Sequence, residues 1–214
     1  MARWGFTVDL ERCIGCLACV IACKVENGTP PNIHWMKVLE KIEEDGDTCG
    51  KRTFVPVRCN HCDDPPCLTA CPSGAIVKRA DGIVTINQKV CIGTMACMTA
   101  CPYYVPSRWD GGDGYYKGER TRYEQAKASK FKVGTAQKCH FCQHRIDEGR
   151  PPACVEACPA QALNYGDLQD PDSSINLQLK QKKHFQPRAE LGTRPALFYL
   201  SGKGGGKAGG GDPR

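Results

Sequence analysis

The chain has 214 residues, of which 41% are hydrophobic and 16 are cysteines, and its formal net charge is +6. This length is enough for one or two small domains, and no apolar stretch approaches the roughly 20 residues that span a bilayer, so we do not expect the chain itself to cross a membrane. The modest charge comes without an RRM, zinc-knuckle or helix-turn-helix signature, which argues against nucleic acid as a partner.

A short strand is expected at residues 6–8, and it leads directly into the first of four cysteine groups. Because this leaves no room for a signal peptide, we expect reduced, metal-binding thiols rather than a disulfide framework. The first group has the spacing C-x2-C-x2-C-x3-C and consists of Cys13, Cys16, Cys19 and Cys23. With this spacing a short loop wraps an iron–sulfur cubane and sends its fourth thiolate to a neighbouring cluster.

The second group precedes a predicted hairpin, in which Asp81-Gly82 is the turn signal and residues 83–86 form a strand. The group consists of Cys59, Cys62, Cys67 and Cys71. Each C-x3-C segment is expected to begin a short helix. In three groups a proline follows the last cysteine and fixes where the chain leaves the cluster, namely Pro72, Pro102 and Pro159.

The third group repeats the first without a gap, since residues 9–23 align with residues 87–101. It contains Cys91, Cys97 and Cys101, and Thr94 stands where the first group has Cys16. A hydroxyl is far too weak an acid to replace a thiolate readily, so the iron at this corner would be labile. The sequence favours a [3Fe–4S] cluster of higher potential here. The open alternative is a [4Fe–4S] cluster whose fourth iron takes the Thr94 oxygen, water or a ligand from a partner.

The fourth group resembles the second and consists of Cys139, Cys142, Cys154 and Cys158. Such an internal repeat indicates two copies of a two-cluster module. Cys49 alone lies outside the four groups, and we expect it to be a free thiol in a loop. His61 and His140 lie inside C-x2-C loops, where we expect solvated rings rather than donors to cluster sulfurs.

Zinc is the competing metal. Zinc sites usually use two separated C-x2-C pairs, whereas the first group crowds four thiolates into eleven residues, and one zinc ion would leave thiolates unused. The repeated spacing therefore favours iron–sulfur clusters. A zinc-stabilised interaction module remains the alternative from a different class of protein.

In two-cluster ferredoxins the fourth cysteine of each motif ligates the other cluster. Applied to the nested repeats, this rule pairs the first group with the fourth and the second with the third, and it predicts four clusters. The first cysteine set is Cys13, Cys16, Cys19 and Cys158; the second is Cys23, Cys139, Cys142 and Cys154; the third is Cys59, Cys62, Cys67 and Cys101; the fourth is Cys71, Cys91 and Cys97, with Thr94 at the vacant ligand position.

We therefore expect an α+β fold of two bacterial ferredoxin-like modules, one inserted in the other. The predicted parts are module 1 at residues 1–50 plus 130–175, module 2 at 51–108, an insertion loop at 109–129, a C-terminal extension at 176–201 and a disordered glycine-rich tail at 202–214. The polar segments 40–51 and 109–132 are expected to be surface loops. No catalytic constellation is visible, so we expect a non-catalytic electron-transfer protein.

The order and spacing of the four groups, together with the motif from Cys59 to Pro72, resemble a known family. They look like the four-cluster ferredoxin-type iron–sulfur (beta) subunits of the DMSO reductase superfamily of molybdenum and tungsten oxidoreductases, which include polysulfide, DMSO, arsenate and nitrate reductases. The resemblance covers roughly residues 3–200. It implies a relay between a molybdopterin catalytic subunit, faced by the first set, and a membrane quinone-reactive or haem (cytochrome) subunit near Thr94. Thr94 departs from the all-cysteine members and is similar to the nitrate reductase group.

The resemblance also implies a membrane-associated complex of anaerobic respiration. Subunits of this type often lack their own signal and are exported bound to the catalytic subunit, so a cytoplasmic and a periplasmic location both stay open. The alternative is that the chain is the electron-transfer subunit of a formate dehydrogenase or hydrogenase-type complex.

Overall fold

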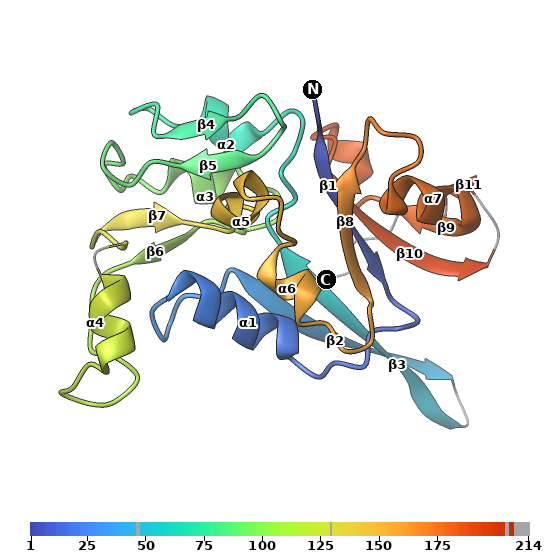
Figure 1. Cartoon of the computed structure of the whole chain (residues 1–214), viewed down its shortest axis with the longest axis horizontal. Helices are drawn as coiled ribbons and strands as arrows, with labels where there is room; N and C mark the ends of the chain where they lie inside the picture. Colours follow the sequence, from blue (N-terminus) through green and yellow to red (C-terminus); the bar gives the residue numbers. More distant parts are fainter. Residues whose placement is uncertain (46–47, 129, 204–205, 208–214) are drawn as a thin grey trace.

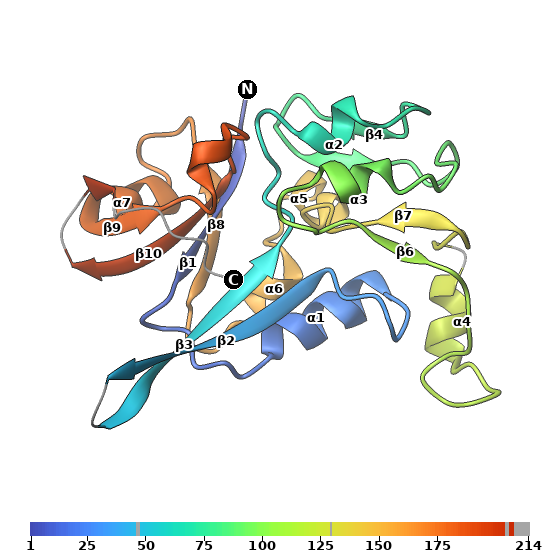
Figure 2. The ribbon, with the colours of Figure 1, turned by 180° about the vertical axis from the view of Figure 1, so that it is seen from behind.

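The structure, a computed structural model, describes residues 1–45, 48–128, 130–203 and 206–207, which form a mixed α/β fold (Figures 1 and 2). In chain order the elements are β1 (Trp4–Asp9), α1 (Ala18–Asn27), β2 (Met36–Asp45), β3 (Thr48–Arg58), α2 (Pro66–Thr69), β4 (Ile76–Lys78), β5 (Val84–Ile86), α3 (Ala96–Ala100), β6 (Ser107–Trp109), α4 (Arg122–Ala128), β7 (Thr135–Gln137), α5 (Gln143–Asp147), α6 (Ala153–Glu156), β8 (Leu163–Asp167), α7 (Ser174–Gln181), β9 (Lys182–Phe185), the 3₁₀ helix η1 (Ala189–Leu191), β10 (Leu197–Lys203) and β11 (Gly206–Lys207). In both views β1, β8, β10 and α7 lie on one side, and β4, β5, α2 and α3 lie on the other.

Strand β1 lies inside a five-stranded sheet with the order β11-β9-β10-β1-β8. It pairs antiparallel with β8 and parallel with β10, so that Phe6 lies opposite Leu197. Phe6 and Val8 belong to the main hydrophobic core. Thr7, on the other face, is covered by α7, where its hydroxyl donates to Gln178 Oε1 at 2.6 Å. The predicted N-terminal strand is confirmed, and the predicted C-terminal extension supplies β9 and most of β10 to the same sheet.

Strands β4 and β5 form the predicted hairpin. The backbone N–H of Arg79 donates to the carbonyl of Ile83 at 2.8 Å, which closes the turn. Gly82 has φ +83°, a left-handed conformation that costs glycine little. The turn predicted at Asp81-Gly82 is confirmed.

Each C-x3-C segment begins a helix, as predicted, and these helices are α1, α2, α3 and α6. A residue before proline is disfavoured in helical backbone, and Cys101, which precedes Pro102, is extended at φ −79° and ψ 112°. In the first group Lys24 follows the last cysteine instead. Helix α1 therefore continues to Asn27, where Gly28 ends it at φ +64°.

The acidic segment 40–51 is not the surface loop that we expect, because its described residues lie in the outer half of the hairpin β2–β3. The pairing starts with Met36 opposite Arg58 near the core and runs outwards. The outer part is a two-stranded ribbon, which tolerates charge in its strands because neither face has to be buried. Arg52 Nε lies 2.5 Å from Glu40 Oε1 across this ribbon. The hairpin also crosses the predicted boundary between the two modules.

The polar segment 109–132 contains helix α4 and packs against the first module. Thr121 and Glu124 form a capping box: the Thr121 N–H donates to Glu124 Oε2 at 2.8 Å, and the Glu124 N–H donates to Thr121 Oγ1 at 3.2 Å. Lys127 Nζ donates to the Glu26 carbonyl on α1 at 3.4 Å. The segment predicted as a loop thus includes a capped helix, and the Thr-x-x-Glu pattern was the signal for it.

The predicted glycine-rich tail is described only in part. Residues 204–205 and 208–214 lie outside the described residues, while β10 extends to Lys203 and β11 pairs in parallel with β9.

Candidate iron–sulfur sites

The loops of the first and third cysteine groups share one backbone conformation. Their left-handed residues are Gly15 (φ +69°) and Leu17 (φ +62°) in the first loop, and Gly93 (φ +75°) and Met95 (φ +58°) in the third. Such conformations are uncommon outside glycine, so their recurrence at matching positions indicates a shared functional geometry. Thr94 therefore occupies the backbone position that Cys16 holds in the first loop.

Alanine at Gly93 is expected to destabilise the protein by about 2–4 kcal/mol, since it adds a contact to the left-handed strain of a Cβ. An added Cβ would lie 2.1 Å from the Gly134 carbonyl oxygen, a backbone atom that cannot simply rotate away. Gly74→Ala is the matched control, because Gly74 has φ +64° and no atom within 4 Å of an added Cβ. Anaerobic urea unfolding of both variants measures the difference. An equal decrease in the free energy of unfolding in both variants would contradict a role for the close contact between Gly93 and Gly134.

All four members of the first set line one cavity beside the start of α1. Cys16 is exposed, and Cys13 and Cys158 are partly buried. The backbone N–H of Ala162 donates to Cys158 Sγ at 3.3 Å. Burial raises the pKa of Cys13, a hydrogen bond from the Gly15 backbone opposes this, and the charges of Cys158 and Cys16 raise it further. The structure thus brings cysteines of the first and fourth groups together at a solvent-accessible place.

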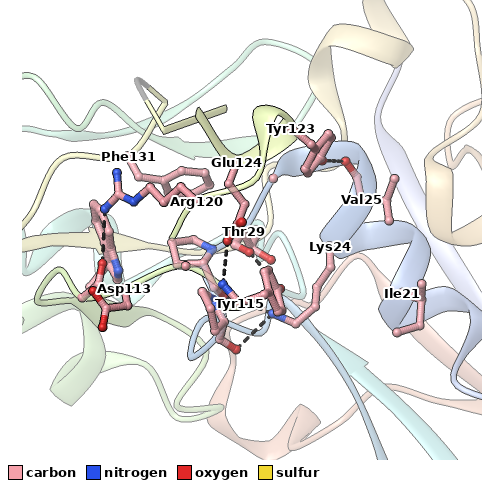
Figure 3. Close-up of a pocket in the computed structure, with 16 residues that line it drawn as sticks. Ile21, Lys24, Val25, Thr29, Asp113, Tyr115, Arg120, Tyr123, Glu124 and Phe131 are labelled. Atoms are coloured by element: carbon pink, nitrogen blue, oxygen red, sulfur yellow. Dashed lines mark hydrogen bonds between the residues drawn. The ribbon is translucent and has the colours of Figure 1, made fainter. Parts of the chain in front are cut away.

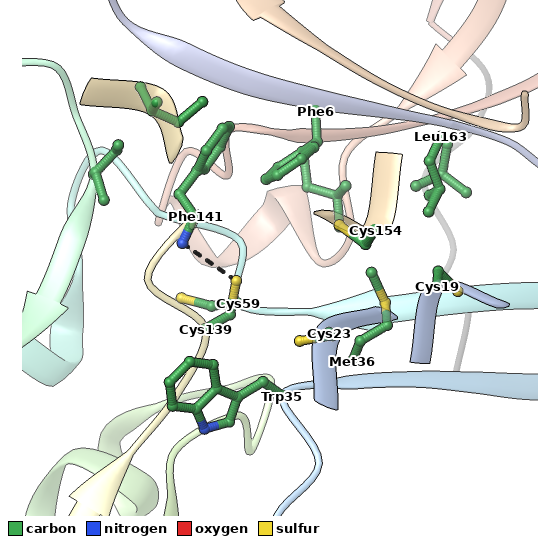
Figure 4. Packing of buried hydrophobic residues seen from close by; sticks show 14 of the residues in the cluster. Phe6, Cys19, Cys23, Trp35, Met36, Cys59, Cys139, Phe141, Cys154 and Leu163 are labelled. Atoms are coloured by element: carbon green, nitrogen blue, oxygen red, sulfur yellow. Dashed lines mark hydrogen bonds between the residues drawn. The ribbon is translucent and has the colours of Figure 1, made fainter. Parts of the chain in front are cut away.

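All four members of the second set line a second, deeper cavity, where Figure 4 shows buried thiols enclosed by aromatic rings. The backbone N–H of Phe141 donates to Cys139 Sγ at 3.4 Å. Asn27 Nδ2 lies 3.6 Å from Cys23 Sγ and 3.9 Å from Cys142 Sγ. Burial raises the pKa of Cys23 well above its ordinary value, and the charge of Cys139 adds to this.

All four members of the third set line a third cavity, and all of them are buried. Pro65, Pro66 and Pro102 contribute to its walls, so the prolines of the cysteine motifs exclude water from the thiols. Burial raises the pKa of Cys62 to about 12, and the charge of Cys59 is the next cause.

The fourth set brings three cysteines together with Thr94 in the adjoining loop. Cys91 and Cys97 are buried, Cys71 is partly buried and Thr94 is exposed. Burial raises the pKa of Cys97, and the charges of Cys91 and Cys71 raise it further. The backbone N–H of Ala136 donates to Cys91 Sγ at 3.5 Å.

Thiols of successive sets also act on one another. The pairs that link the sets are Cys19 with Cys154, Cys139 with Cys59, and Cys67 with Cys97. Burial is the largest cause of the raised pKa of Cys19, Cys139 and Cys67, each of which reaches about 12, and the linked thiol adds to it. The packing agrees: one hydrophobic cluster contains cysteines of the first, second and third sets, and another contains cysteines of the third and fourth, so the sets adjoin in the order first, second, third, fourth.

Each of the three cavities presents four cysteines. With Zn–S bonds of about 2.3 Å, one zinc ion needs its four sulfurs nearly in contact. Among the residues that the structure describes, no group of three or more histidine, cysteine or acidic side chains is close enough to hold one metal ion. Four cysteine ligands per cavity are the number that a [4Fe–4S] cluster takes.

His61 is fully buried, so our prediction of a solvated ring is wrong. Its Nδ1 accepts the Val84 N–H at 3.1 Å, which leaves the proton on Nε2, and Nε2 has no hydrogen-bond partner among the described residues. Burial holds the pKa of His61 well below its usual value, with further lowering by Lys138 and Arg58. His140 is partly buried, and burial lowers its pKa to about 4.

A separate cavity lies between α1 and the segment 109–131, and no cysteine lines it (Figure 3). Ile21 and Val25 on α1 face Tyr115 and Phe131 across it. This cavity lies on the outer face of α1 and does not belong to the cysteine sites.

Cys49 lies in β3, but its side chain is outside the part of the chain that the structure describes, so its predicted role as a free thiol stays a prediction. Within the described ranges, no helix is both long and apolar enough to cross a bilayer.

Comparison with known proteins identifies iron–sulfur domains in this chain. Two models of 4Fe–4S dicluster domains match, one over residues 12–75 and the other over residues 51–117 and 121–168. The chain is 38% identical to the iron–sulfur subunit of the arsenate respiratory reductase of Shewanella sp. (strain ANA-3), over 92% of this chain and 96% of that protein. It is 36% identical to a tetrathionate reductase subunit of Salmonella typhimurium, over 92% and 72% of the two chains. It is also 36% identical to an iron–sulfur subunit of the Hdr-like menaquinol oxidoreductase of Archaeoglobus fulgidus, over 92% and 82%.

Proposed function

Since this chain belongs to the family of 4Fe–4S dicluster iron–sulfur subunits of molybdoenzyme reductases, we propose that it relays single electrons along a row of four clusters. It is an electron-transfer subunit of a reductase complex and is not itself catalytic. When bound, the clusters supply one-electron redox chemistry, and the protein contributes position, burial and charge.

The four predicted cysteine sets are the proposed ligands. The observation that carries this proposal is that three cavities are each lined by one complete predicted set. The fourth set supports a different cluster, because Thr94 stands at the ligand position and is exposed to solvent. We propose three [4Fe–4S] clusters and one [3Fe–4S] cluster, the latter held by Cys71, Cys91 and Cys97. The order in which the sets adjoin supports a row rather than a compact group.

The two ends of the row are the proposed docking places. Ile14, in the loop of the first set, is 63% exposed, and its repeat counterpart Ile92, beside Thr94, is 66% exposed. Exposed apolar side chains next to electron-transfer sites suit contact with another subunit. We propose that the first set faces a molybdopterin catalytic subunit. The Thr94 end would then face a membrane quinone-reactive or haem subunit, in keeping with the relative named as a menaquinol oxidoreductase subunit.

Truncation of Cys97 to alanine is expected to remove the fourth cluster and to leave the other three. Cys97 is a buried member of the fourth set and lines none of the three cavities formed by the other sets. Iron analysis and EPR of the purified chain measure the loss, and Thr99→Ala, an exposed change on the same helix, is the control. Loss of all four clusters together would show that the sets do not assemble independently.

The experiment that tests the function is EPR of the anaerobically purified, mildly oxidised complex, combined with iron, zinc and molybdenum analysis. An oxidised [3Fe–4S] cluster is paramagnetic, whereas oxidised [4Fe–4S] cubanes are silent. The proposal predicts one spin per chain that a weak reductant removes, together with molybdenum or tungsten in the co-purifying subunit. A colourless complex with stoichiometric zinc would exclude the relay.

A further inference from the structure

Two buried cations stand next to the interior cysteine sets. Arg58 and Lys138 are only 3% and 4% exposed. Each directly precedes the first cysteine of a C-x2-C pair, Cys59 and Cys139 respectively. In the part of the chain that the structure describes, no ion pair involves either residue. An unpaired buried charge is costly, so something must compensate both cations.

Arg58 lines the cavity of the second set. Its Nη1 donates to Cys154 Sγ at 3.3 Å, and its Cζ lies 3.0 Å from the centre of the Phe6 ring. Its Nε and Nη2 are buried without hydrogen-bond partners. A guanidinium stays charged at any pH at which proteins fold, so this site holds a permanent positive charge with unused donors.

Lys138 lines the cavity of the third set. Its Nζ donates to the carbonyl oxygens of Val84 and Cys139. Neither acceptor carries a formal charge. The Lys138 side chain therefore lies at the wall of the cavity that the four cysteines of the third set line, with no carboxylate paired to it in the described part of the chain.

Each of the two cations lies in the cavity of the cysteine set to which its neighbour in the sequence does not belong. Arg58 precedes a cysteine of the third set but lines the second cavity, and Lys138 precedes a cysteine of the second set but lines the third cavity. The first cavity has no arginine, lysine or histidine among its lining residues, and its Cys16 is exposed to solvent. Cations therefore accompany the sites that water reaches least.

We propose that Arg58 and Lys138 compensate the negative charge of the two interior clusters and raise their reduction potentials. This inference rests on the proposed cysteine sets. Burial without compensation disfavours the more negative, reduced form of a cluster, and a nearby fixed cation opposes that effect. One electron enters an interior site from the neighbouring site on one side and leaves to the other, and no bond or proton changes at Arg58.

The test is redox potentiometry of the full chain, loaded with iron, with EPR as the readout. Arg58→Met is expected to decrease the reduction equilibrium constant of one cluster at least tenfold, about 59 mV for a one-electron couple. Lys138→Met is expected to shift a different cluster in the same direction. Arg150→Gln is the control, because Arg150 is an exposed arginine that pairs only with Glu148 among the described residues.

Iron content separates this inference from the proposed function. Four clusters with unchanged potentials in both methionine variants would overturn the role of the cations while leaving the relay intact. A shift of the same cluster by both variants would also overturn it. If Arg58→Met did not retain its iron, Arg58→Lys would decide: retention in the lysine variant alone supports charge compensation, and loss in both overturns it for Arg58.

Discussion

Replacing Thr94 by cysteine is expected to convert the fourth cluster from [3Fe–4S] to [4Fe–4S] and to lower its reduction potential by on the order of 100 mV. The loop is already shaped for a ligand at this position, because Gly93 and Met95 repeat the left-handed conformations of Gly15 and Leu17. A thiolate there would retain the corner iron that a hydroxyl does not hold. The EPR signal of the oxidised protein should disappear, and the iron content should rise by one atom per chain.

Thr94→Ser is the matched control for this change. It keeps a hydroxyl at the same backbone position and should preserve the oxidised EPR signal. A wild-type protein that is EPR-silent when oxidised, with iron near sixteen atoms per chain, would mean that Thr94, water or a partner already completes a fourth cubane. That result would contradict the prediction of a distinct high-potential cluster at the Thr94 end. The proposed row of four sites would still stand.

Removal of iron is expected to abolish cooperative unfolding and to lower the free energy of unfolding by more than about 5 kcal/mol. The reason is that the free energy of binding metal at a structural site contributes directly to the stability of the fold. Cysteines are members of all three hydrophobic clusters in the described part of the chain. Nε and Nη2 of Arg58 and Nε2 of His61 are buried without hydrogen-bond partners among the described residues. Thermal unfolding followed by circular dichroism, before and after anaerobic treatment with an iron chelator, measures the effect.

Reconstitution with iron and sulfide is the control for chelation and should restore the transition. An iron-free protein that unfolds cooperatively at the same temperature as the loaded one would show that apolar packing alone holds the fold. In that case the cysteine cavities would be sites on a preformed scaffold.

Much of the site followed from spacing alone. The C-x3-C intervals predicted four helices, and the gapless alignment of the first and third groups predicted the position of Thr94. Both are local properties of the chain, so tertiary packing has little opportunity to override them. The hairpin β2–β3 was missed for the opposite reason. Its charged outer half has the composition of a loop, and only its pairing partner makes it a strand.

The interior cations and His61 were missed because their roles depend on residues far away in the sequence. Arg58 acts on Cys154, and the ring of His61 is buried against Phe141, with ring centres 5.3 Å apart. A basic residue before each C-x2-C pair was visible in the sequence. The role of this basic residue was not visible, because each cation lines the cavity of the cysteine set that its sequence neighbour does not belong to.

The nested arrangement of the cavities sets an order of assembly during synthesis. The cysteines of the third cavity all lie between Cys59 and Cys101, which leave the ribosome close together, whereas the first cavity needs Cys158, the last cysteine of the chain. Because a chain emerges from its N-terminus at about 5–20 residues per second, the thiols of the first group remain unpaired for several seconds. They are the earliest to be made and the latest to be ligated. If each proposed set binds its cluster only once it is complete, we expect oxygen or an electrophile to react first with Cys13 and Cys16 on the nascent chain.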